Sequence, residues 1–394
     1  MRIVHVVDYF MPKMGYQENL LAKWNAKEGH EVIVLTGDRY YPVKDYENTW
    51  YPILGQRICK PGVQKINNYE VIRLPVLFEV KHRPWLRGLR ETIIKTKPDV
   101  IMVHGTGSFN LIRCALISKY LNIPCIADNH MIFHIIQKNV FAKLYYILNR
   151  LLLKNLIIDL VYKFIGVTNE TCSYLEKYEK IPKEKIFHLP LGIDEEIFKY
   201  KKVNSYEKKI FVITQTGKMS DDKKPQWLAD AAINLIKQKK LNLVLNYIGG
   251  GPKNIVKNIE KKFEKENLQK NLIIRDFVEV EKLPNVYYES DICVYPNGTS
   301  LSALEAAACG SLVIMADYPA SKDRESKGIG ITYRTGDIEH LASLIEKLLL
   351  NRDLREKIID NSVKAIQKEY SYKEISKKFT TLCFEAINYK RSHL

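Results

Sequence analysis

The stretch Asp291–Ala316, DICVYPNGTSLSALEAAACGSLVIMA, joins two apolar runs through a polar turn and an alanine-rich segment. Short apolar runs bounded by turn residues are typical of buried strands, and the run of Ala, Leu and Glu between them is typical of a helix. A strand, a helix and a second strand in this order indicate a parallel sheet covered by helices. The fold class of the whole chain follows from this unit.

The same alternation extends along most of the 394 residues and restarts near Lys209 with IFVITQTG. We therefore expect an α/β fold with two doubly wound, Rossmann-like domains facing each other across a cleft, at residues 1–198 and 199–371. The polar stretch Asp194–Lys209 is the expected linker, and a last helix at about 372–394 is expected to pack back onto the first domain. A ligand would bind in the cleft, at the carboxyl ends of the strands.

The chain carries a formal net charge of +16, with 46% hydrophobic and 27% charged residues. This composition is typical of a globular protein, and the positive charge favours polyanions, acidic lipid headgroups or phosphorylated substrates. A solvated lysine-rich surface explains part of the charge. Because no nucleic-acid module and no basic run interleaved with aromatic residues occurs, we expect no nucleic-acid partner.

The chain opens on MRIVHVVDYF, which reads as a buried strand rather than a secretion leader, so we expect a cytoplasmic protein. Its seven cysteines are scattered without paired spacing and without a nearby histidine cluster. This pattern indicates reduced thiols and argues against a zinc site.

Two basic and apolar segments occur in the first half. The segment Phe141–Phe164, FAKLYYILNRLLLKNLIIDLVYKF, is apolar, but four basic residues interrupt it, so it cannot span a membrane and would instead lie in the membrane surface. The segment Lys81–Arg90, KHRPWLRGLR, adds a basic cluster around Trp85. Solvated helix faces over a core would give the same pattern. Since both segments lie in one half, we favour peripheral contact with the cytosolic face of a membrane.

Two glycine-containing turns follow predicted strands. Gly15, in DYFMPKMGYQENLL, lies where the first strand gives way to a helix, and a glycine there lets backbone N–H groups approach an anion. IGGGP, Ile248–Pro252, follows a strand in the second half. Either glycine turn is also common without a ligand. Because IGGGP lacks the G-x-G-x-x-G spacing, no nicotinamide cofactor is indicated.

Lysines and histidines follow other strands at the same expected edge. Lys218, Lys223 and Lys224 follow the first strand of the second domain, where ammonium groups could neutralise a departing diphosphate as a metal would elsewhere. A solvated turn explains the same residues. His104 and His130 follow strands of the first domain, where a histidine could bond a substrate hydroxyl, although a structural histidine is the simpler explanation for either alone.

Glu305 lies in the first turn of the helix that follows the Pro296 loop. There its carboxylate could accept hydrogen bonds from a ribose diol, while Thr299 to Ser302 offer backbone amides to phosphate. A glutamate that only stabilises the helix N-terminus is the alternative.

The order of these motifs resembles the family-4 glycosyltransferases of the GT-B fold over nearly the whole chain. The pieces that carry the resemblance include YFMPKMGYQENLLAKWNAKEGHEVIVLTGDRYYP, KPDVIMVHGTG, IPCIADNH, KIFHLPLGIDEEIF, GKMSDDKKPQWLADA, YIGGGP, ESDICVYPNGTSLSALEAAACGSLVIMAD and GIGITYRTGDIEHLASLI. Each piece alone is weak, but eight of them occur in the family's order.

The resemblance implies roles for individual residues. Glu305 matches the second glutamate of the family's E-x7-E motif, which holds the nucleotide ribose, and Lys218 and Lys223 match its basic pair on the diphosphate. His130 matches the active-site histidine beneath the donor sugar, and Gly15 matches the glycine loop. The remaining candidates are assigned to donor binding (Asn297, Gly298, Thr299, Ser300, Leu301 and Ser302) and to acceptor binding (Tyr16, Gln17 and His104).

The family also implies a reaction. A sugar would pass from a nucleotide-diphosphate-sugar, with a UDP-sugar favoured, to a glycan or lipid-linked acceptor, with retention of anomeric configuration and without a metal or other cofactor. The protein would contribute positioning and stabilisation of the leaving phosphate.

Two positions depart from the family's pattern. Asn297 stands where the first glutamate of the motif is expected, so contact with a sugar survives but a negative charge is lost. Lys218 replaces the usual arginine, a point charge in place of a two-pronged donor. Two alternatives therefore stay open: a sugar-nucleotide isomerase resembling the 2-epimerases, for which no clear pair of acid and base carboxylates is visible, and a non-catalytic sugar-nucleotide binder.

Overall fold

The computed structural model describes residues 1–43, 46–80, 82–131, 144, 147, 148, 151, 157–202, 210–298 and 300–392. It divides into two compact units, Met1–Leu191 with Tyr372–Leu394, and Gly192–Ser371. The unit boundary thus falls at Leu191, and the stretch expected as a linker lies inside the second unit as far as it is described, with 203–209 outside the described residues.

The first unit is built on an eight-stranded sheet in the order β10-β9-β8-β7-β1-β2-β4-β3. All neighbouring strands are parallel except β3 and β4. The strands are β1 (Arg2–Val7), β2 (Glu31–Gly37), β3 (Gly62–Ile66), β4 (Tyr69–Leu74), β7 (Val100–His104), β8 (Cys125–Asn129), β9 (Val161–Gly166) and β10 (Ile186–His188). A separate antiparallel hairpin joins β5 (Val76–Val80) to β6 (Arg83–Leu86).

Helices cover both faces of this sheet, which explains why its central strands are apolar throughout. On one face the core includes Val4 and Val6 of β1, and on the other Ile3 packs with residues of the last helix. The helices of the unit are α1 (Gln17–Lys27), α2 (Tyr46–Thr49), α3 (Tyr51–Leu54), α4 (Leu89–Thr96), α5 (Phe109–Leu121), α8 (Asn169–Lys177), the 3-10 turn η2 (Lys183–Lys185) and α16 (Tyr372–Ser392).

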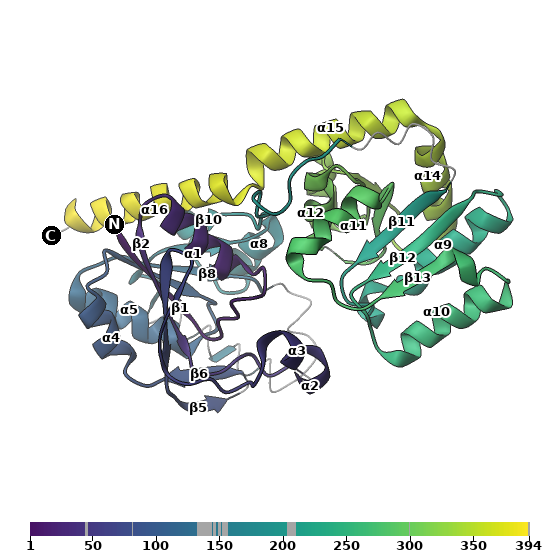
Figure 1. The fold of residues 1–394 in the computed structure, drawn as a ribbon. Coiled ribbons are helices and arrows are strands. Elements are labelled where there is room, and N and C mark those ends of the chain that lie inside the picture. The colour runs from purple at the N-terminus through teal and green to yellow at the C-terminus, as the bar shows by residue number, and fades with distance from the viewer. Residues whose placement is uncertain are drawn as a thin grey trace. The chain divides into compact units, whose positions relative to one another are not determined.

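The last helix, α16, belongs to the first unit although the whole second unit precedes it in sequence. It packs along α1, as Figure 1 shows in yellow and purple. Asn25 Nδ2 of α1 donates to Ser376 Oγ at 2.8 Å, and Thr380 Oγ1 donates to Glu28 Oε2 at 2.7 Å. Phe379 is fully buried between these contacts.

The second unit has a six-stranded, wholly parallel sheet in the order β13-β12-β11-β14-β15-β16. Its strands are β11 (Phe211–Thr216), β12 (Leu243–Ile248), β13 (Leu272–Arg275), β14 (Ile292–Tyr295), β15 (Leu312–Ala316) and β16 (Ile331–Tyr333). Its helices are α9 (Pro225–Lys237), α10 (Lys253–Lys265), α11 (Leu283–Glu289), α12 (Ser302–Cys309), α13 (Pro319–Ser326), α14 (Ile338–Leu350) and α15 (Arg352–Glu369), with 3-10 turns η3 (Asp221–Lys223), η4 (Gln269–Asn271) and η5 (Val280–Lys282).

The predicted α/β class with two mainly parallel sheets is confirmed, and each strand candidate named from the sequence is a strand. The segment Lys81–Arg90 is not the solvated helix face that was the alternative to membrane contact, because Arg83–Leu86 is strand β6, paired with β5. Trp85 is half-buried there: its ring stacks on Phe78 at 5.6 Å between centroids, and the Arg113 guanidinium lies 4.3 Å from the ring centroid.

None of the helices in the described part of the chain combines enough length and apolar character to cross a bilayer. Most of the segment Phe141–Phe164 lies outside the described residues.

Replacing Phe379 by alanine should lower the free energy of unfolding by about 3 to 5 kcal/mol, because the ring is fully buried against the first sheet. Urea unfolding followed by circular dichroism measures the change. Phe384 lies on the same helix but is 48% exposed, so Phe384→Ala is the matched control and should cost about 1 kcal/mol or less. Equal losses in both variants would contradict the packing of α16 described above.

Candidate functional site

In the second unit, the predicted residues gather where the strand order reverses. β11 and β14 are neighbours, but the chain adds β12 and β13 on one side and β15 and β16 on the other. Loops that leave such a pair diverge and open a crevice at the carboxyl ends of the strands. Lys218 and Lys223 follow β11, and Asn297 to Ser302 follow β14, so both groups lie at this edge. We call it the donor edge: the loops Gly217–Lys224 and Pro296–Leu301 and the first turn of α12.

The glycines of IGGGP hold the lysine loop in place. The N–H of Gly217 donates to Ile248 O at 2.8 Å, and the N–H of Met219 donates to Gly250 O at 2.7 Å. A Cβ on Gly249 would lie 2.7 Å from the carbonyl of Gly217, and a Cβ on Gly251 only 2.4 Å from Met219 O. This close backbone approach requires glycine, so these residues have a structural role in supporting Lys218.

Asn297 joins the two loops of the donor edge. Its Nδ2 donates to Asp222 O at 2.6 Å, and its Oδ1 accepts from Tyr318 Oη at 2.7 Å. On the next residue, Gly298, an added Cβ would lie 3.5 Å from Lys223 Nζ. The amide of Asn297 thus has protein partners already, and its contact with a donor sugar stays a prediction.

Glu305 is placed by two tyrosines beneath the first turn of α12. Its Oε2 accepts from Tyr287 Oη at 3.1 Å, and Tyr287 Oη is itself 3.2 Å from Thr216 Oγ1 at the end of β11. Tyr295 Oη donates to Ser302 O at 2.7 Å and so fixes the start of the helix. Burial raises the pKa of Glu305 to about 7, although the Tyr287 and Ser302 side chains bond to it. The carboxylate can therefore change its charge near neutral pH.

Side chains of the second unit hold the backbone of the Pro296 loop in place through hydrogen bonds to its carbonyl groups. Arg324, which is 8% exposed, donates from Nη1 to Ser300 O at 2.6 Å, and burial lowers its pKa to about 10. Tyr333 Oη donates to Pro296 O at 2.6 Å. The N–H of Ser302, predicted to face phosphate, lies 3.2 Å from Ser300 Oγ, which accepts from it. Thr299 lies outside the described residues.

In the first unit, the predicted residues gather at the corresponding reversal between β1 and β7. Gly15, Tyr16 and Gln17 follow β1, His104 ends β7, and His130 follows β8. We call this the histidine edge: His5, the Gly15–Glu18 turn, His104, Asp128 and His130.

At the histidine edge, three polar side chains form a row on the three adjacent strands β1, β7 and β8. His104 is in register with Asp128 of β8 and with Val7 of β1, so it lies on the same face as Asp128 and as His5, two residues before Val7. His5 Nδ1 is 3.0 Å from His104 Nε2, and His104 Nδ1 is 2.5 Å from Asp128 Oδ2.

Asp128 also reaches the exposed histidine of this edge. Its Oδ1 accepts from the N–H of Gly105 at 2.9 Å and lies 3.8 Å from His130 Nε2. Asp128 is fully buried, whereas the His130 side chain is 43% exposed. Both ring nitrogens of His104 thus have protein partners already, and its contact with an acceptor stays a prediction.

In the described part of the chain, nothing that Gly15 or Gln17 contacts explains why these residue types occur there. The backbone φ of Gly15 is not in the left-handed region, and a Cβ there would meet nothing within 4 Å. Gln17 is 4% exposed, and neither its Oε1 nor its Nε2 has a hydrogen-bond partner among the described residues. Buried polar groups are almost always paired, so the Gln17 amide is expected to bind a group that the structure does not contain, such as a ligand. Tyr16, by contrast, is exposed.

Sequence reasoning missed Asp8, Glu18 and Asp128 in the first unit and Arg324 in the second. Asp8 follows β1, where its Oδ1 accepts from Ser108 Oγ at 2.6 Å and from Asn110 Nδ2 at 2.9 Å. Glu18 lies in the first turn of α1 beside both histidines, and burial raises its pKa. For Asp8 and Asp128 the available signal was a charged residue inside or directly after an apolar run, which requires a partner.

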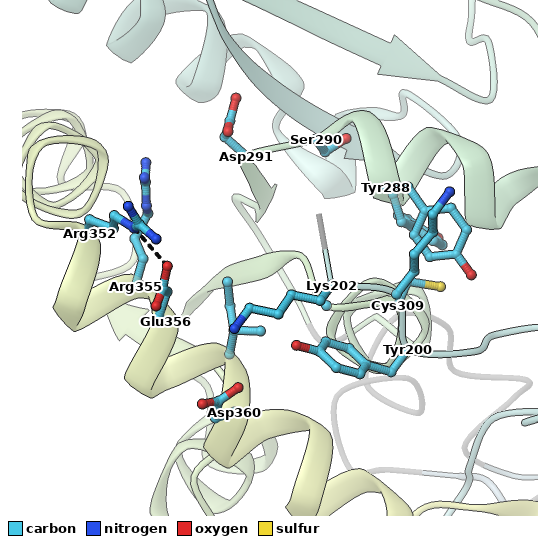
Figure 2. Close-up of a pocket in the computed structure, with 14 residues that line it drawn as sticks. Tyr200, Lys202, Tyr288, Ser290, Asp291, Cys309, Arg352, Arg355, Glu356 and Asp360 are labelled. Carbon is cyan, nitrogen blue, oxygen red and sulfur yellow. Dashed lines mark hydrogen bonds and ion pairs between the residues drawn. The ribbon is translucent and has the colours of Figure 1, made fainter. Parts of the chain in front are cut away.

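A hollow of the second unit lies at the edge of the sheet opposite to the donor edge. Ser290 and Asp291 in its wall come before β14, whereas the donor-edge loop Pro296–Leu301 comes after it. Figure 2 shows Arg352, Arg355 and Glu356 of α15 on one side of it and Lys202 and Tyr200 on the other. None of the predicted site residues lines this hollow. Among the described residues, no group of three or more His, Cys, Asp or Glu side chains could hold a metal ion.

Comparison with known proteins decides the family. Residues 19–197 match the model of Glycosyltransferase Family 4, and residues 210–351 match that of Glycosyl transferases group 1. The chain belongs to the family-4 glycosyltransferases. The two matches together cover most of both units, and the predicted resemblance is confirmed.

A sequence relative and two solved structures are consistent with this family assignment. The chain is 22% identical over 324 residues to UDP-Gal:alpha-D-GlcNAc-diphosphoundecaprenol alpha-1,3-galactosyltransferase of Escherichia coli, which covers 73% of this chain and 78% of the relative. Its fold is similar to HepE of Anabaena in complex with UDP (TM-score 0.71, 14% identity, 98% and 100% covered). It is also similar to sucrose-phosphate synthase from Thermosynechococcus elongatus (TM-score 0.69, 16% identity, 98% and 99% covered). These likenesses show the GT-B fold.

Proposed function

We propose that this glycosyltransferase transfers a sugar from a nucleotide-diphosphate-sugar, with a UDP-sugar favoured, to a glycan or lipid-linked acceptor, with retention of configuration and without a metal. The observation that carries the proposal is the donor edge, where the Glu305 carboxylate and the ammonium groups of Lys218 and Lys223 lie on or beside loops that hydrogen bonds hold in place. The UDP complex of HepE and the UDP-galactose donor named for the Escherichia coli relative support a UDP-sugar.

The donor edge suits a nucleoside diphosphate chemically. A ribose diol offers two hydroxyl donors to Glu305, and the diphosphate offers anionic oxygens to the two lysines. When the bond between the sugar carbon and the phosphate breaks, negative charge grows on the departing phosphate. Ammonium groups fixed at that point stabilise this charge as a metal ion does in other enzymes.

Retention needs no covalent nucleophile in this scheme. The acceptor oxygen forms its bond to the sugar carbon on the face that the phosphate leaves, and the proton of the acceptor hydroxyl passes to the departing phosphate oxygen. The histidine edge then serves to hold the acceptor, with Tyr16, which is exposed, and Gln17, whose amide has no partner among the described residues, as its binding groups and His130 beside the reacting sugar. The diphosphoundecaprenol acceptor named for the Escherichia coli relative supports a lipid-linked acceptor. The 2-epimerase alternative gains no support from the two family matches.

Lys218→Ala and Lys223→Ala should each lower kcat by about 100-fold with a smaller change in donor affinity, because the lysines act mainly on the charge of the departing phosphate. The assay follows release of nucleoside diphosphate from a panel of UDP-, GDP- and ADP-sugars, with and without EDTA. Lys257, exposed on α10, provides the control Lys257→Ala, which should leave kcat unchanged. A loss of donor affinity without a loss of kcat would argue against leaving-group stabilisation, and a loss of activity in EDTA would contradict metal independence.

Glu305→Gln should weaken UDP binding by about 1 to 3 kcal/mol and remove its pH dependence. Because the pKa of Glu305 is raised to about 7 by burial, the carboxylate is largely protonated below that pH and must ionise to accept both ribose hydroxyls. Wild-type affinity should therefore rise from pH 6 to pH 8, with a proton released on binding. Titration calorimetry in buffers of different ionisation enthalpy measures both effects. Equal affinities at both pH values in the wild type would count against the ribose assignment.

We also propose that the β5–β6 hairpin contacts the surface of an anionic membrane at the cytosolic face. Leu77, Phe78 and Val80 expose 63%, 44% and 51% of their surface there. Glu79 fixes the hairpin by accepting from Tyr9 Oη and from Arg57 Nη2, both at 2.6 Å. Arg87 and Arg90, both exposed, follow β6 directly and add positive charge next to the apolar side chains. Apolar and basic side chains together bind acidic lipid surfaces.

The double variant Leu77→Glu/Phe78→Glu should bind vesicles of phosphatidylglycerol and phosphatidylcholine about tenfold or more weakly than the wild type, because burying such side chains contributes on the order of 2 kcal/mol each. Sedimentation with the vesicles measures the loss. Val63 of β3 is 66% exposed outside the hairpin, so Val63→Glu is the matched control and should bind as the wild type does. Equal losses in both variants would contradict a role for the hairpin itself.

A further inference from the structure

The histidine edge contains a continuous chain of four polar side chains that starts in the core and ends at the surface. It runs from His5, fully buried on β1, through His104 and Asp128 to the 43% exposed His130. The first two links are 3.0 and 2.5 Å long, and the last, from Asp128 Oδ1 to His130 Nε2, is 3.8 Å. Asp128 is the only member of this chain that faces two histidines.

We propose that Asp128 is a positioning residue that keeps His130 protonated, so that the exposed end of the chain presents a charged imidazolium to the substrates. The inference rests on the proposed function only in assigning substrates to this edge. The charge of His130 itself follows from the geometry around Asp128 and is measurable without any substrate.

The surroundings of Asp128 keep its own charge in place. It is fully buried, where an isolated carboxylate would become neutral, but His104 Nδ1 and the N–H of Gly105 both bond to it. Burial alone would raise the pKa of Asp128. These partners together with His130 instead hold that pKa well below its usual range. A negative charge is therefore fixed beside His130 over the whole physiological pH range.

His5 closes the inner end of the chain. Burial, and next the charge of His104, lower the pKa of His5 to about 3, so it stays neutral. The ring of Phe379 lies 6.0 Å from the His5 ring between centroids, and both side chains are fully buried. A neutral, buried His5 cannot share the charge of Asp128, which leaves that charge to His104 and His130.

The titratable groups that face His130 from the described elements are Asp128 of β8 and Glu18 of α1, with His104 of β7 behind Asp128. Burial opposes protonation of His130, but the two carboxylates outweigh it and raise its pKa. Glu18 contributes less than Asp128 to the raised pKa of His130. An N–H on each ring nitrogen then lets His130 donate to a phosphate or sugar oxygen.

The test is the titration of His130 in the full-length protein without substrates, followed by NMR of histidine labelled at Cε1 and assigned with His130→Gln. In Asp128→Asn the pKa of His130 should fall by about 1 unit or more, because an opposite charge 3.8 Å from its Nε2 is lost. Asp128→Glu should recover part of the shift. Glu70 is an exposed residue of β4, so Glu70→Gln removes one negative charge elsewhere in the unit and should leave His130 unchanged.

An unchanged pKa of His130 in Asp128→Asn would overturn the proposal. If that variant fails to fold, the wild-type titration decides, because the proposal requires a pKa above the ordinary value of about 6.5. In the transfer assay, the alkaline limb of the pH profile of kcat/KM should move to lower pH in Asp128→Asn, a change that a purely structural role would not produce. A shifted pKa in a protein without transferase activity would sustain this inference and reject the proposed function.

Discussion

The donor edge depends on one close contact between two backbone turns. Gly249 and Gly251, after β12, approach the Gly217–Met219 turn, after β11, so closely that any Cβ would collide with its carbonyl groups. Two backbone hydrogen bonds, Gly217 N to Ile248 O and Met219 N to Gly250 O, fix the distance. This contact therefore determines the backbone position of Lys218 and of the turn that carries Lys223. Asn297, bonded to Asp222 O, then ties the loop after β14 to the same support.

The two edges prepare charge in different ways. At the donor edge, Lys218 is exposed and Lys223 is half-buried, and Glu305 has a pKa of about 7 because it is buried, with Tyr287 bonded to it. At the histidine edge, the charged groups are paired within the fold, and Asp128 distributes its charge between His104 and His130. A site of the first kind suits an anion that arrives and departs. A site of the second kind suits a fixed orientation of neutral hydroxyl groups.

The sequence predicts the alternating architecture well because a buried parallel strand has a local signature, a short apolar run between turn residues. The runs that became β1, β2, β7 and β11 are of this kind. The β5–β6 hairpin was missed because Val76–Val80 and Arg83–Leu86 mix exposed apolar and charged residues without such a run. Lys218, Lys223 and Glu305 could be placed at the donor edge from the sequence because each follows a strand there, and their roles in binding stay predictions.

The supporting residues of the site could not be found in this way. Arg324 looks like a surface residue in its sequence context, and only the packing of α13 buries it against Ser300 O. His5 and Asp128 are 123 positions apart in sequence and are linked through His104 only because β1, β7 and β8 are adjacent in the sheet. Strand order is a tertiary property, so a single sequence indicates that a buried charge needs a partner without saying which partner it has.

The central claim is that the donor edge of the second unit binds the nucleotide part of the donor, and a crystal structure of the protein soaked with UDP tests it most directly. The account predicts density for the ribose within hydrogen-bonding distance of Glu305 and for the diphosphate beside Lys218 and Lys223. Ordered UDP in the hollow between Tyr200 and α15 shown in Figure 2, with an empty donor edge, would contradict it.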